Sequence, residues 1–138
     1  MFGPKCTAMY KMVQHATKTN QFEGPVVGPV GMYLKINRGK EQYAKIAELA
    51  IGPGHLDRFI VTHRADMELL KKFRRSTSCG TRDCSIFQIH QRAAKDKYRT
   101  PSPPEGVETV ASVLNIDDPM VFNYLVGTFA QIKHDSYE

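Results

Sequence analysis

Apolar residues recur along this chain at two different periods, and each period predicts one kind of element. Between residues 40 and 51 they fall at i, i+3, i+4, i+7 and i+8, which predicts an amphipathic helix. The predicted buried face of that helix consists of Tyr43, Ile46, Ala47, Ala50 and Ile51. Residues 30–36, 58–62 and 85–90 are short runs rich in apolar and β-forming residues, so they predict three strands.

Helical spacing and capping residues predict three more helical segments. Residues 1–21 form a helical or irregular lead-in, with one apolar face made of Met9, Met12, Val13 and Ala16. Asp66 is expected to cap a helix that buries Leu69, Leu70 and Phe73. A last helix is expected after Asp117 or Asp118, with Pro119 in its first turn and with Val121, Tyr124, Leu125 and Phe129 on its buried side.

The order of these elements predicts the fold class. Strands and helices alternate as far as residue 90, and a strand or helix and then the last helix follow the basic and Pro-rich segment 91–106. Prolines disfavour regular structure, so this segment is expected to be a mobile loop. The pattern predicts an α+β fold in which helices pack on a small mixed β-sheet.

Composition narrows the class of protein. The chain has 138 residues, enough for one domain with a core, and 41% of them are hydrophobic, which is ordinary for a globular protein. No window approaches the roughly 18 apolar residues of a membrane span, and the first 20 residues lack the apolar core of a signal peptide. The sequence therefore predicts an intracellular domain that makes no membrane contact. The net charge of +5 permits binding to nucleic acid without requiring it.

The three cysteines do not suggest a disulfide framework or a metal site. Cys6, Cys79 and Cys84 are odd in number and sparse, unlike the cysteines of small secreted domains. Cys79 and Cys84 lie five residues apart with His90 beyond them, but no fourth zinc ligand is apparent. We expect thiols in a loop and at its margin, with no bound metal or cofactor.

A glycine- and proline-rich stretch stands directly before the strand predicted at 30–36. Gly reaches backbone angles that other residues avoid, and Pro fixes φ and donates no hydrogen bond. We interpret Gly24, Gly28, Pro29 and Gly31 as a structural turn that leads into the sheet. Phosphate binding by the glycine N–H groups is the less favoured interpretation, because the prolines remove donors and a strand follows instead of a helix.

This stretch also resembles part of a known family. The run GPVVGPVGMYLKI at 24–36, followed by LDRFIVTHRADMELL at 56–70, resembles the hinge domain of structural maintenance of chromosomes (SMC) proteins. Among these proteins it is most similar to the sixth eukaryotic SMC subunit. Three other segments resemble hinge motifs in the same order along the chain: Phe2-Gly3-Pro4, residues 47–52 and residues 114–119.

The resemblance implies an architecture and a set of partners. Residues 22–106 would be the first hinge subdomain, and residues 107–138 would be the start of a truncated second one. An SMC hinge of this type implies heterodimerisation with a partner hinge of the fifth-subunit type. It also implies chromosome maintenance, DNA repair and recombination, DNA binding and a nuclear, chromosome-associated location. No Gly-rich loop ending in Gly-Lys-Ser/Thr is present, so we expect no ATP hydrolysis.

Two basic clusters are candidates for DNA contact, single strands included. The first consists of Lys71, Lys72, Arg74 and Arg75, with Arg82 nearby. The second consists of Lys95, Lys97 and Arg99, with Arg92 before them and Tyr98 interleaved. Cationic side chains neutralise phosphates, and aromatic rings stack on unpaired bases. The alternatives are a solvated helix end for the first cluster and a solubilising loop for the second.

No arrangement of residues indicates catalysis. His63 and Asp66 are close in sequence and Cys84 is available, but no nucleophile motif surrounds them. We therefore expect a module that is not an enzyme. Two alternatives stay open at this point: a small intracellular α+β ligand-binding domain, and a non-functional fragment of a longer gene.

Overall fold

A computed structural model describes residues 6–77, 84–97 and 114–136, with residues 128–136 described by their backbone alone. Several features singled out in the sequence lie outside these residues. They are Cys79, Arg82, Tyr98, Arg99, the prolines at 101–104 and the motif Phe2-Gly3-Pro4.

A three-stranded sheet organises the chain around strand β3 (Phe59–Val61). β3 pairs antiparallel with β1 (Val26–Val27) and parallel with β4 (Ile86–Gln88). The strands expected at 58–62 and 85–90 are therefore present. Helix α4 (Arg64–Ser76) lies between the two parallel strands in the sequence, as a parallel pair requires a crossover connection.

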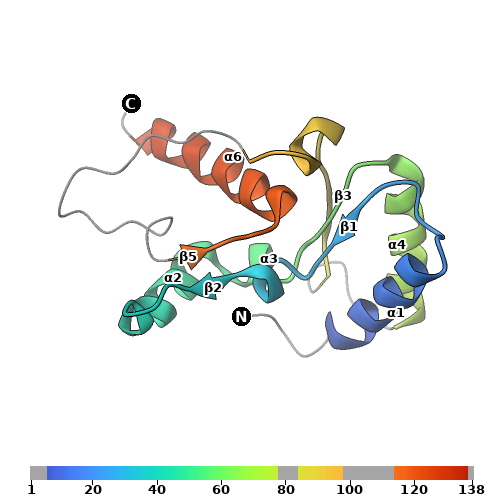
Figure 1. Cartoon of the computed structure of the whole chain (residues 1–138), viewed down its shortest axis with the longest axis horizontal. Helices are drawn as coiled ribbons and strands as arrows, with labels where there is room; N and C mark the ends of the chain where they lie inside the picture. The colour runs from blue at the N-terminus through green and yellow to red at the C-terminus, as the bar shows by residue number, and fades with distance from the viewer. Residues whose placement is uncertain (1–5, 78–83, 98–113, 137–138) are drawn as a thin grey trace.

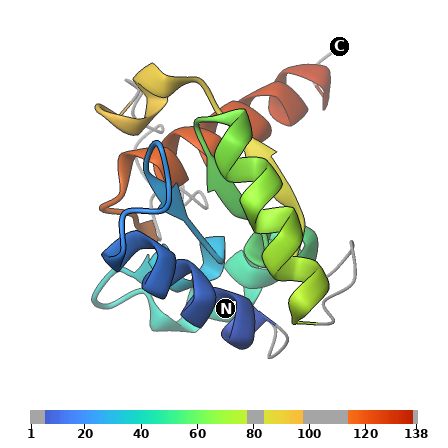
Figure 2. The ribbon, with the colours of Figure 1, turned by 90° about the vertical axis from the view of Figure 1, so that its right-hand side faces the viewer.

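One face of β3 is covered by two helices. Helix α1 (Cys6–Lys18) and α4 lie side by side on this face (Figures 1 and 2). Successive side chains of a strand point to opposite faces, so Phe59 and Val61 share this side while Ile60 faces away. The buried residues here, which we call the α1/α4 core, are Cys6, Met9, Val13, Phe59, Val61, Leu70 and Cys84.

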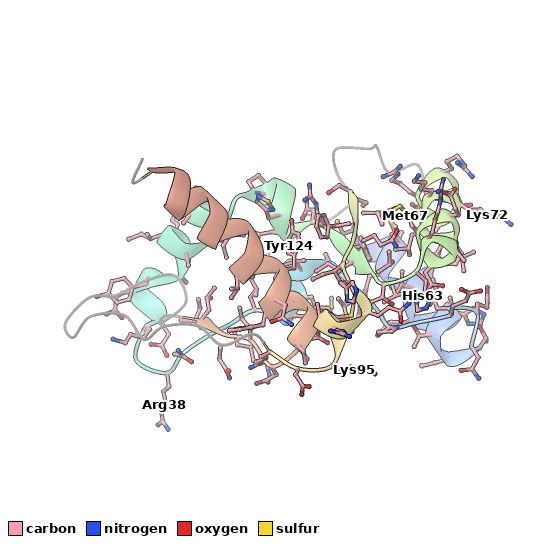
Figure 3. The ribbon with its side chains drawn as sticks, turned by 90° about the horizontal axis from the view of Figure 1, so that it is seen from above. Arg38, His63, Met67, Lys72, Lys95 and Tyr124 are labelled. Atoms are coloured by element: carbon pink, nitrogen blue, oxygen red, sulfur yellow. The ribbon has the colours of Figure 1, made fainter. Side chains whose placement is uncertain are left out.

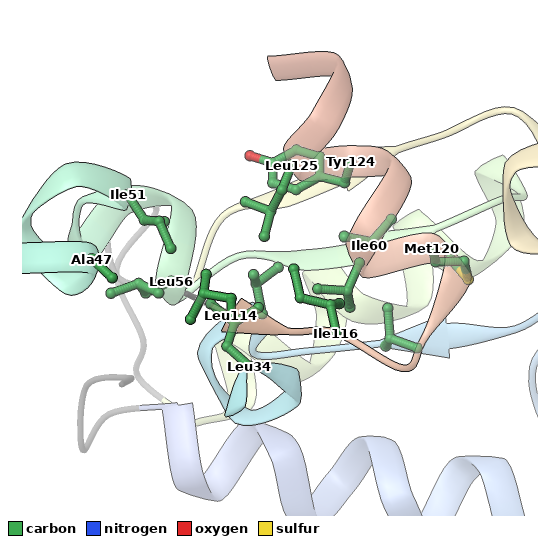
Figure 4. Packing of buried hydrophobic residues seen from close by; sticks show 13 residues of the cluster. Leu34, Ala47, Ile51, Leu56, Ile60, Leu114, Ile116, Met120, Tyr124 and Leu125 are labelled. Carbon is green, nitrogen blue, oxygen red and sulfur yellow. The ribbon is translucent and has the colours of Figure 1, made fainter. Parts of the chain in front are cut away.

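The second face of β3 supports a larger core. Ile60 belongs there to a cluster of buried residues from helix α6 (Pro119–Ser136), helix α2 (Ala44–Ile51) and the short helix α3 (Pro53–Leu56) (Figure 4). A two-stranded antiparallel ribbon of β2 (Lys35–Ile36) and β5 (Leu114–Asn115) closes the far end. This α6 core contains Val27, Val30, Leu34, Ala47, Ile51, Leu56, Ile60, Leu114, Ile116, Met120, Val121, Tyr124 and Leu125.

The prediction of a strand over residues 30–36 is mostly wrong. Residues Val30–Tyr33 form a 3-10 helix, η1, and only Lys35–Ile36 is extended in a sheet. The peptide bond between Gly28 and Pro29 is cis, and Pro29 precedes the turn. The Val30 N–H donates to the Arg58 carbonyl at 3.0 Å, and the Met32 N–H donates to the Pro29 carbonyl at 3.0 Å. These bonds hold the segment as a turn against β3, with Val30 buried.

The two predicted helix caps have different outcomes. Asp118 caps α6 as expected, because its Oδ1 accepts the N–H groups of Met120 at 2.9 Å and Val121 at 3.2 Å. Asp66 is not a cap, since α4 begins two residues earlier at Arg64. Its buried carboxylate instead accepts the N–H groups of Glu23 at 2.8 Å and Gly24 at 2.9 Å.

Helix α2 is where predicted, after a 3-10 turn η2 (Glu41–Tyr43), but its buried face is narrower than the spacing indicated. Only Ala47 and Ile51 are buried on it. Ile46 is 64% exposed and its neighbour Leu49 is 72% exposed. The helix lies at the edge of the α6 core, so the described residues cover one side of it. Gly52, with φ +87, ends it.

Candidate nucleic-acid interface

A hollow opens at one end of the sheet, where the parallel strands β3 and β4 both finish. Its volume is about 710 Å³. We call it the basic hollow, and its lining residues are Thr62, Gln88, Ile89, His90, Gln91, Arg92 and Lys95. The carboxyl ends of parallel strands meet at one edge, and this brings Thr62 and Ile89 together although they are far apart in sequence.

Hydrogen bonds of the backbone and of side chains hold the segment that carries the cationic residues of the basic hollow. The Ile89 N–H donates to the Val61 carbonyl at 2.8 Å, which extends the β3–β4 pairing by one residue. A 3-10 turn, η3 (Gln91–Ala94), follows, and His90 Nδ1 accepts the N–H of Arg92 at 3.2 Å. The segment expected to be a mobile loop at 91–106 thus begins as a defined turn.

Hydrogen bonds from helix α6 hold this turn in place. The buried side-chain amide of Asn123 donates to the carbonyls of Ala93 and Asp96, each at 2.8 Å. Both bonds are made by one buried NH₂ group, so the segment 93–96 is tied to the α6 core rather than to solvent. Arg92 and Lys95 are consequently presented from a fixed backbone.

The lining of the basic hollow is positively charged. Its lining includes Arg92 and Lys95 but neither Asp nor Glu, and both cationic residues are exposed. No ion pair involves either of them in the described ranges 6–77, 84–97 and 114–127. Guanidinium and ammonium groups pair well with phosphate, and the volume is in the range of ligand sites. The hollow is therefore suited to a phosphate-bearing ligand.

His63, two residues after β3, contacts two of the polar residues that line the basic hollow, Thr62 and Gln91. His63 Nδ1 lies 2.9 Å from the Thr62 hydroxyl, and His63 Nε2 lies 3.3 Å from Gln91 Nε2. The carboxylate of Asp66 accepts the backbone N–H groups of Glu23 and Gly24, and no hydrogen bond joins it to His63. Within the described residues, no three His, Cys, Asp or Glu side chains come together to hold a metal ion.

Lys97 lies beside the basic hollow rather than in its lining. Its Nζ is 5.2 Å from the centroid of the Phe122 ring, a cation–π distance that draws the side chain toward α6. Of the second basic cluster, the structure therefore places Lys95 in the hollow and Lys97 next to it, and Arg99 lies outside the described residues.

The first basic cluster sits on the last turns of α4 and is partly engaged within the protein. Lys71 Nζ lies 3.5 Å from Glu68 Oε1, and Arg74 donates to the Cys84 carbonyl at 3.3 Å. Lys72 and Arg75 are exposed. In Figure 3, Lys72 and Lys95 lie apart with His63 between them, so the two clusters do not merge into one patch. Arg82 is outside the described residues.

The glycine-rich segment lies against β3 and the start of α4. The Gly24 N–H is taken by Asp66, so it is not offered to a ligand. Gly28 has φ +148, and a Cβ there would lie 2.4 Å from Cδ1 of Phe59. Gly31 is buried within η1, directly after Pro29 and Val30. Gly24, Gly28, Pro29 and Gly31 thus lie where the backbone turns closely over β3.

A polar network at the opposite ends of β3 and β4, where both strands begin, was missed by sequence reasoning. The Tyr124 hydroxyl accepts a hydrogen bond from Arg58 at 2.8 Å and lies 2.6 Å from His55 Nδ1, and Arg58 also donates to the Ser85 hydroxyl at 2.9 Å. Burial, and secondarily the positive charge of Arg58, lower the pKa of His55 below its usual 6.5. These partners come from α3 and α6 and from the residues directly before β3 and β4, so no local sequence motif indicates the network.

Comparison with known proteins identifies the fold. No family model and no curated protein sequence matches the chain. Among solved structures, the S. pombe Smc5/6 hinge domain superposes with a TM-score of 0.64 and 22% sequence identity over 90% of this chain. The fold is that of an SMC hinge.

The hinge likeness confirms the predicted α+β class and its hinge-like arrangement. It covers 46% of the S. pombe hinge chain, so the present chain spans about half the length of that hinge chain. The described helices include none that is long and apolar enough to cross a membrane.

Proposed function

We propose that this chain is a hinge-type module of an SMC complex, without catalytic activity, that pairs with a partner SMC hinge and contacts DNA. The observation that carries the proposal is the SMC hinge fold, which extends over 90% of the chain. Within this proposal the module belongs to chromosome maintenance, DNA repair and recombination in the nucleus.

The finer assignment concerns which SMC subunits are involved. The runs at 24–36 and 56–70 favour the sixth-subunit type for this chain, and hence a partner hinge of the fifth-subunit type. Helix α2 supports a protein partner, because Ile46 and Leu49 are exposed side by side on one helical face. Exposed apolar side chains that lie together mark surfaces that other proteins cover.

The pairing half of the proposal is tested with a fifth-type SMC hinge and the double variant Ile46→Lys/Leu49→Lys. Sedimentation velocity of the mixture is expected to show a heterodimer with the native chain and at least about tenfold weaker pairing with the variant, because two charges would be buried. Gln14→Lys/His15→Lys on the exposed side of α1 adds the same two residues elsewhere and is the control. Absence of any complex with the native chain would refute the pairing.

The DNA half depends on the basic hollow. Two cations with no Asp or Glu among the described lining residues, a backbone held by hydrogen bonds and a hollow of about 710 Å³ support a phosphate contact there. The cluster on α4 supports it less, since Lys71 and Arg74 already have partners in the protein. We therefore propose Arg92 and Lys95 as the principal phosphate contacts, with Lys72 and Arg75 secondary.

Two charge-reversal variants separate these sites. Arg92→Glu/Lys95→Glu and Lys72→Glu/Arg75→Glu change the net charge by the same amount, so only the position differs. Fluorescence anisotropy with a labelled single-stranded oligonucleotide is expected to show that the first variant binds roughly tenfold or more weakly. The slope of log affinity against log salt concentration is expected to be smaller by about 1.4. The affinity of the second variant for the oligonucleotide is expected to fall by roughly threefold or less. Equal losses would show binding through net charge alone.

A further inference from the structure

Two cysteine thiols meet inside the α1/α4 core. Cys6 is the first residue of α1, and Cys84 lies two residues before β4. Both side chains are fully buried, and their Sγ atoms lie 3.5 Å apart. Cys84 stands at the margin of the predicted loop, as expected, and the fold buries its side chain together with that of Cys6 in a packed core.

The contact joins distant parts of the chain at a point where a bond would have structural consequences. The two residues are 78 positions apart in sequence. The Cys6 thiol also donates to the Asp57 carbonyl at 3.8 Å, and the Cys84 carbonyl accepts from Arg74. Cys6 thus stands where α1 meets the start of β3, and Cys84 stands where α4 meets the start of β4.

The separation of the sulfurs is close to bonding distance. A disulfide requires about 2.05 Å between the sulfurs, so the two atoms need to approach by about 1.5 Å. Rotation about the Cα–Cβ bond of either side chain moves its sulfur by that order while the backbone stays in place. The geometry therefore does not require α1 to leave the sheet.

We propose that Cys6 and Cys84 are a modification site that forms a reversible intrachain disulfide by exchange with a small disulfide compound such as glutathione disulfide. One cysteine thiolate attacks the disulfide, forms a mixed disulfide and releases one glutathione thiolate. The second cysteine thiolate then attacks the protein sulfur and releases the second glutathione. Two protein thiols become one disulfide, and the reagent gains the two electrons and the two protons.

Burial determines the conditions under which the reaction occurs. Buried thiols are slow to react, and reducing compartments keep such pairs reduced. Exchange therefore requires the first turn of α1 to open, since Cys6 is its first residue. The disulfide then ties α1 to the residue that leads into β4. It closes a long loop in the unfolded chain, which stabilises the folded state.

The experiment uses the full chain with Cys79→Ser, which leaves the proposed pair intact and removes the third thiol. The reduced protein is equilibrated with glutathione buffers of increasing disulfide content, trapped by alkylation and measured by intact mass and peptide mapping. The expected product is one Cys6–Cys84 disulfide, about 2 Da lighter than the reduced chain, with a Tm higher by roughly 10 °C. Dithiothreitol is expected to restore the reduced mass and Tm.

Two further variants make the result decisive. Cys6→Ala and Cys84→Ala, in the same background, are expected to stop at the glutathione mixed disulfide and to show no rise in Tm. Two alkylated thiols in the most oxidising buffer would overturn the proposal. A disulfide that forms only when urea is present would also overturn it, because the folded geometry would then not bring the sulfurs together.

Discussion

Strand β3 separates two cores that the chain covers to different extents. On the side of Phe59 and Val61, α1 and α4 pack over the sheet and present polar outer faces to solvent. On the side of Ile60, the larger α6 core ends in α2, whose outer face exposes Ile46 and Leu49. The helices over the α1/α4 core thus have polar solvent-facing sides. Helix α2, at the edge of the α6 core, has an apolar one, which agrees with our proposal that a protein partner binds there.

The two faces of β3 also differ in what their neighbouring residues do. The residues that tie the α1/α4 core together, such as Asp66 and Gly28, act inside the fold. On the α6 side, Asn123 holds the turn that carries the cations of the basic hollow, and Tyr124 belongs to the polar network with Arg58 and His55. Substitutions on the first side are therefore expected to affect folding most, and those on the second side to be milder.

The largest effect is expected from Gly28→Ala. A Cβ at this position would lie 2.4 Å from Cδ1 and 2.8 Å from Cα of Phe59, and φ of +148 disfavours any L side chain. Backbone strain and overpacking together predict a loss of about 3 to 5 kcal/mol in the free energy of unfolding, measured by urea denaturation. Gly54→Ala is the control, because among the described residues no atom outside its own helix and chain neighbours lies within 4 Å of its Cβ position. Equal effects of the two changes would show that contact with Phe59 does not matter.

Asp66→Ala is expected to have the second-largest effect on stability. The change leaves the N–H groups of Glu23 and Gly24 without their acceptor at a part-buried position. An unsatisfied buried donor costs roughly 1 to 3 kcal/mol, so about 3 kcal/mol is expected for the two. Glu68→Ala removes a carboxylate from the exposed side of the same helix and is expected to cost less than about 0.5 kcal/mol. A small effect of Asp66→Ala would mean that water replaces the carboxylate.

The two aspartates show what local sequence can and cannot predict. Asp118 bonds the helix that directly follows it, so proximity in sequence was enough to predict its role. Asp66 bonds a segment more than 40 residues earlier, and its position near a helix start suggested the wrong partner. Sequence spacing therefore identified the helices at 44–51 and 64–76, but not the long-range bonds that orient them.

The same limit applies to surfaces. The apolar spacing of α2 was visible, but whether Ile46 is covered depends on how far the α6 core extends. The cations Arg92 and Lys95 were also visible in the sequence, whereas Thr62 and Gln88 belong to the hollow because β3 and β4 pair in parallel. Charge density alone favoured the α4 cluster, whose Lys71 and Arg74 have partners within the protein.

On the α6 side, Tyr124→Phe tests a milder interaction. The change keeps the aromatic ring, which stacks edge-on with Phe87 at a centroid distance of 5.0 Å, and removes the hydroxyl that bonds Arg58 and His55. A charged donor loses its acceptor, so the expected cost is about 1 to 2 kcal/mol. Tyr10→Phe removes a hydroxyl bonded only to exposed Gln14 among the described residues and is expected to be neutral within about 0.5 kcal/mol. A neutral Tyr124→Phe would mean that the network adds no stability.

The smallest effect is expected from pH, acting through His55. Burial and then the charge of Arg58 lower its pKa in the folded state, while the unfolded chain retains a value near 6.5. Between these two values the unfolded state binds more protons, so stability is fully present above pH 6.5 and falls as pH decreases through this window. The effect is modest because the half-buried ring remains partly hydrated. His55→Gln should reduce the change in urea midpoint between pH 7.5 and 5.5, and an unchanged pH dependence would show that other groups dominate.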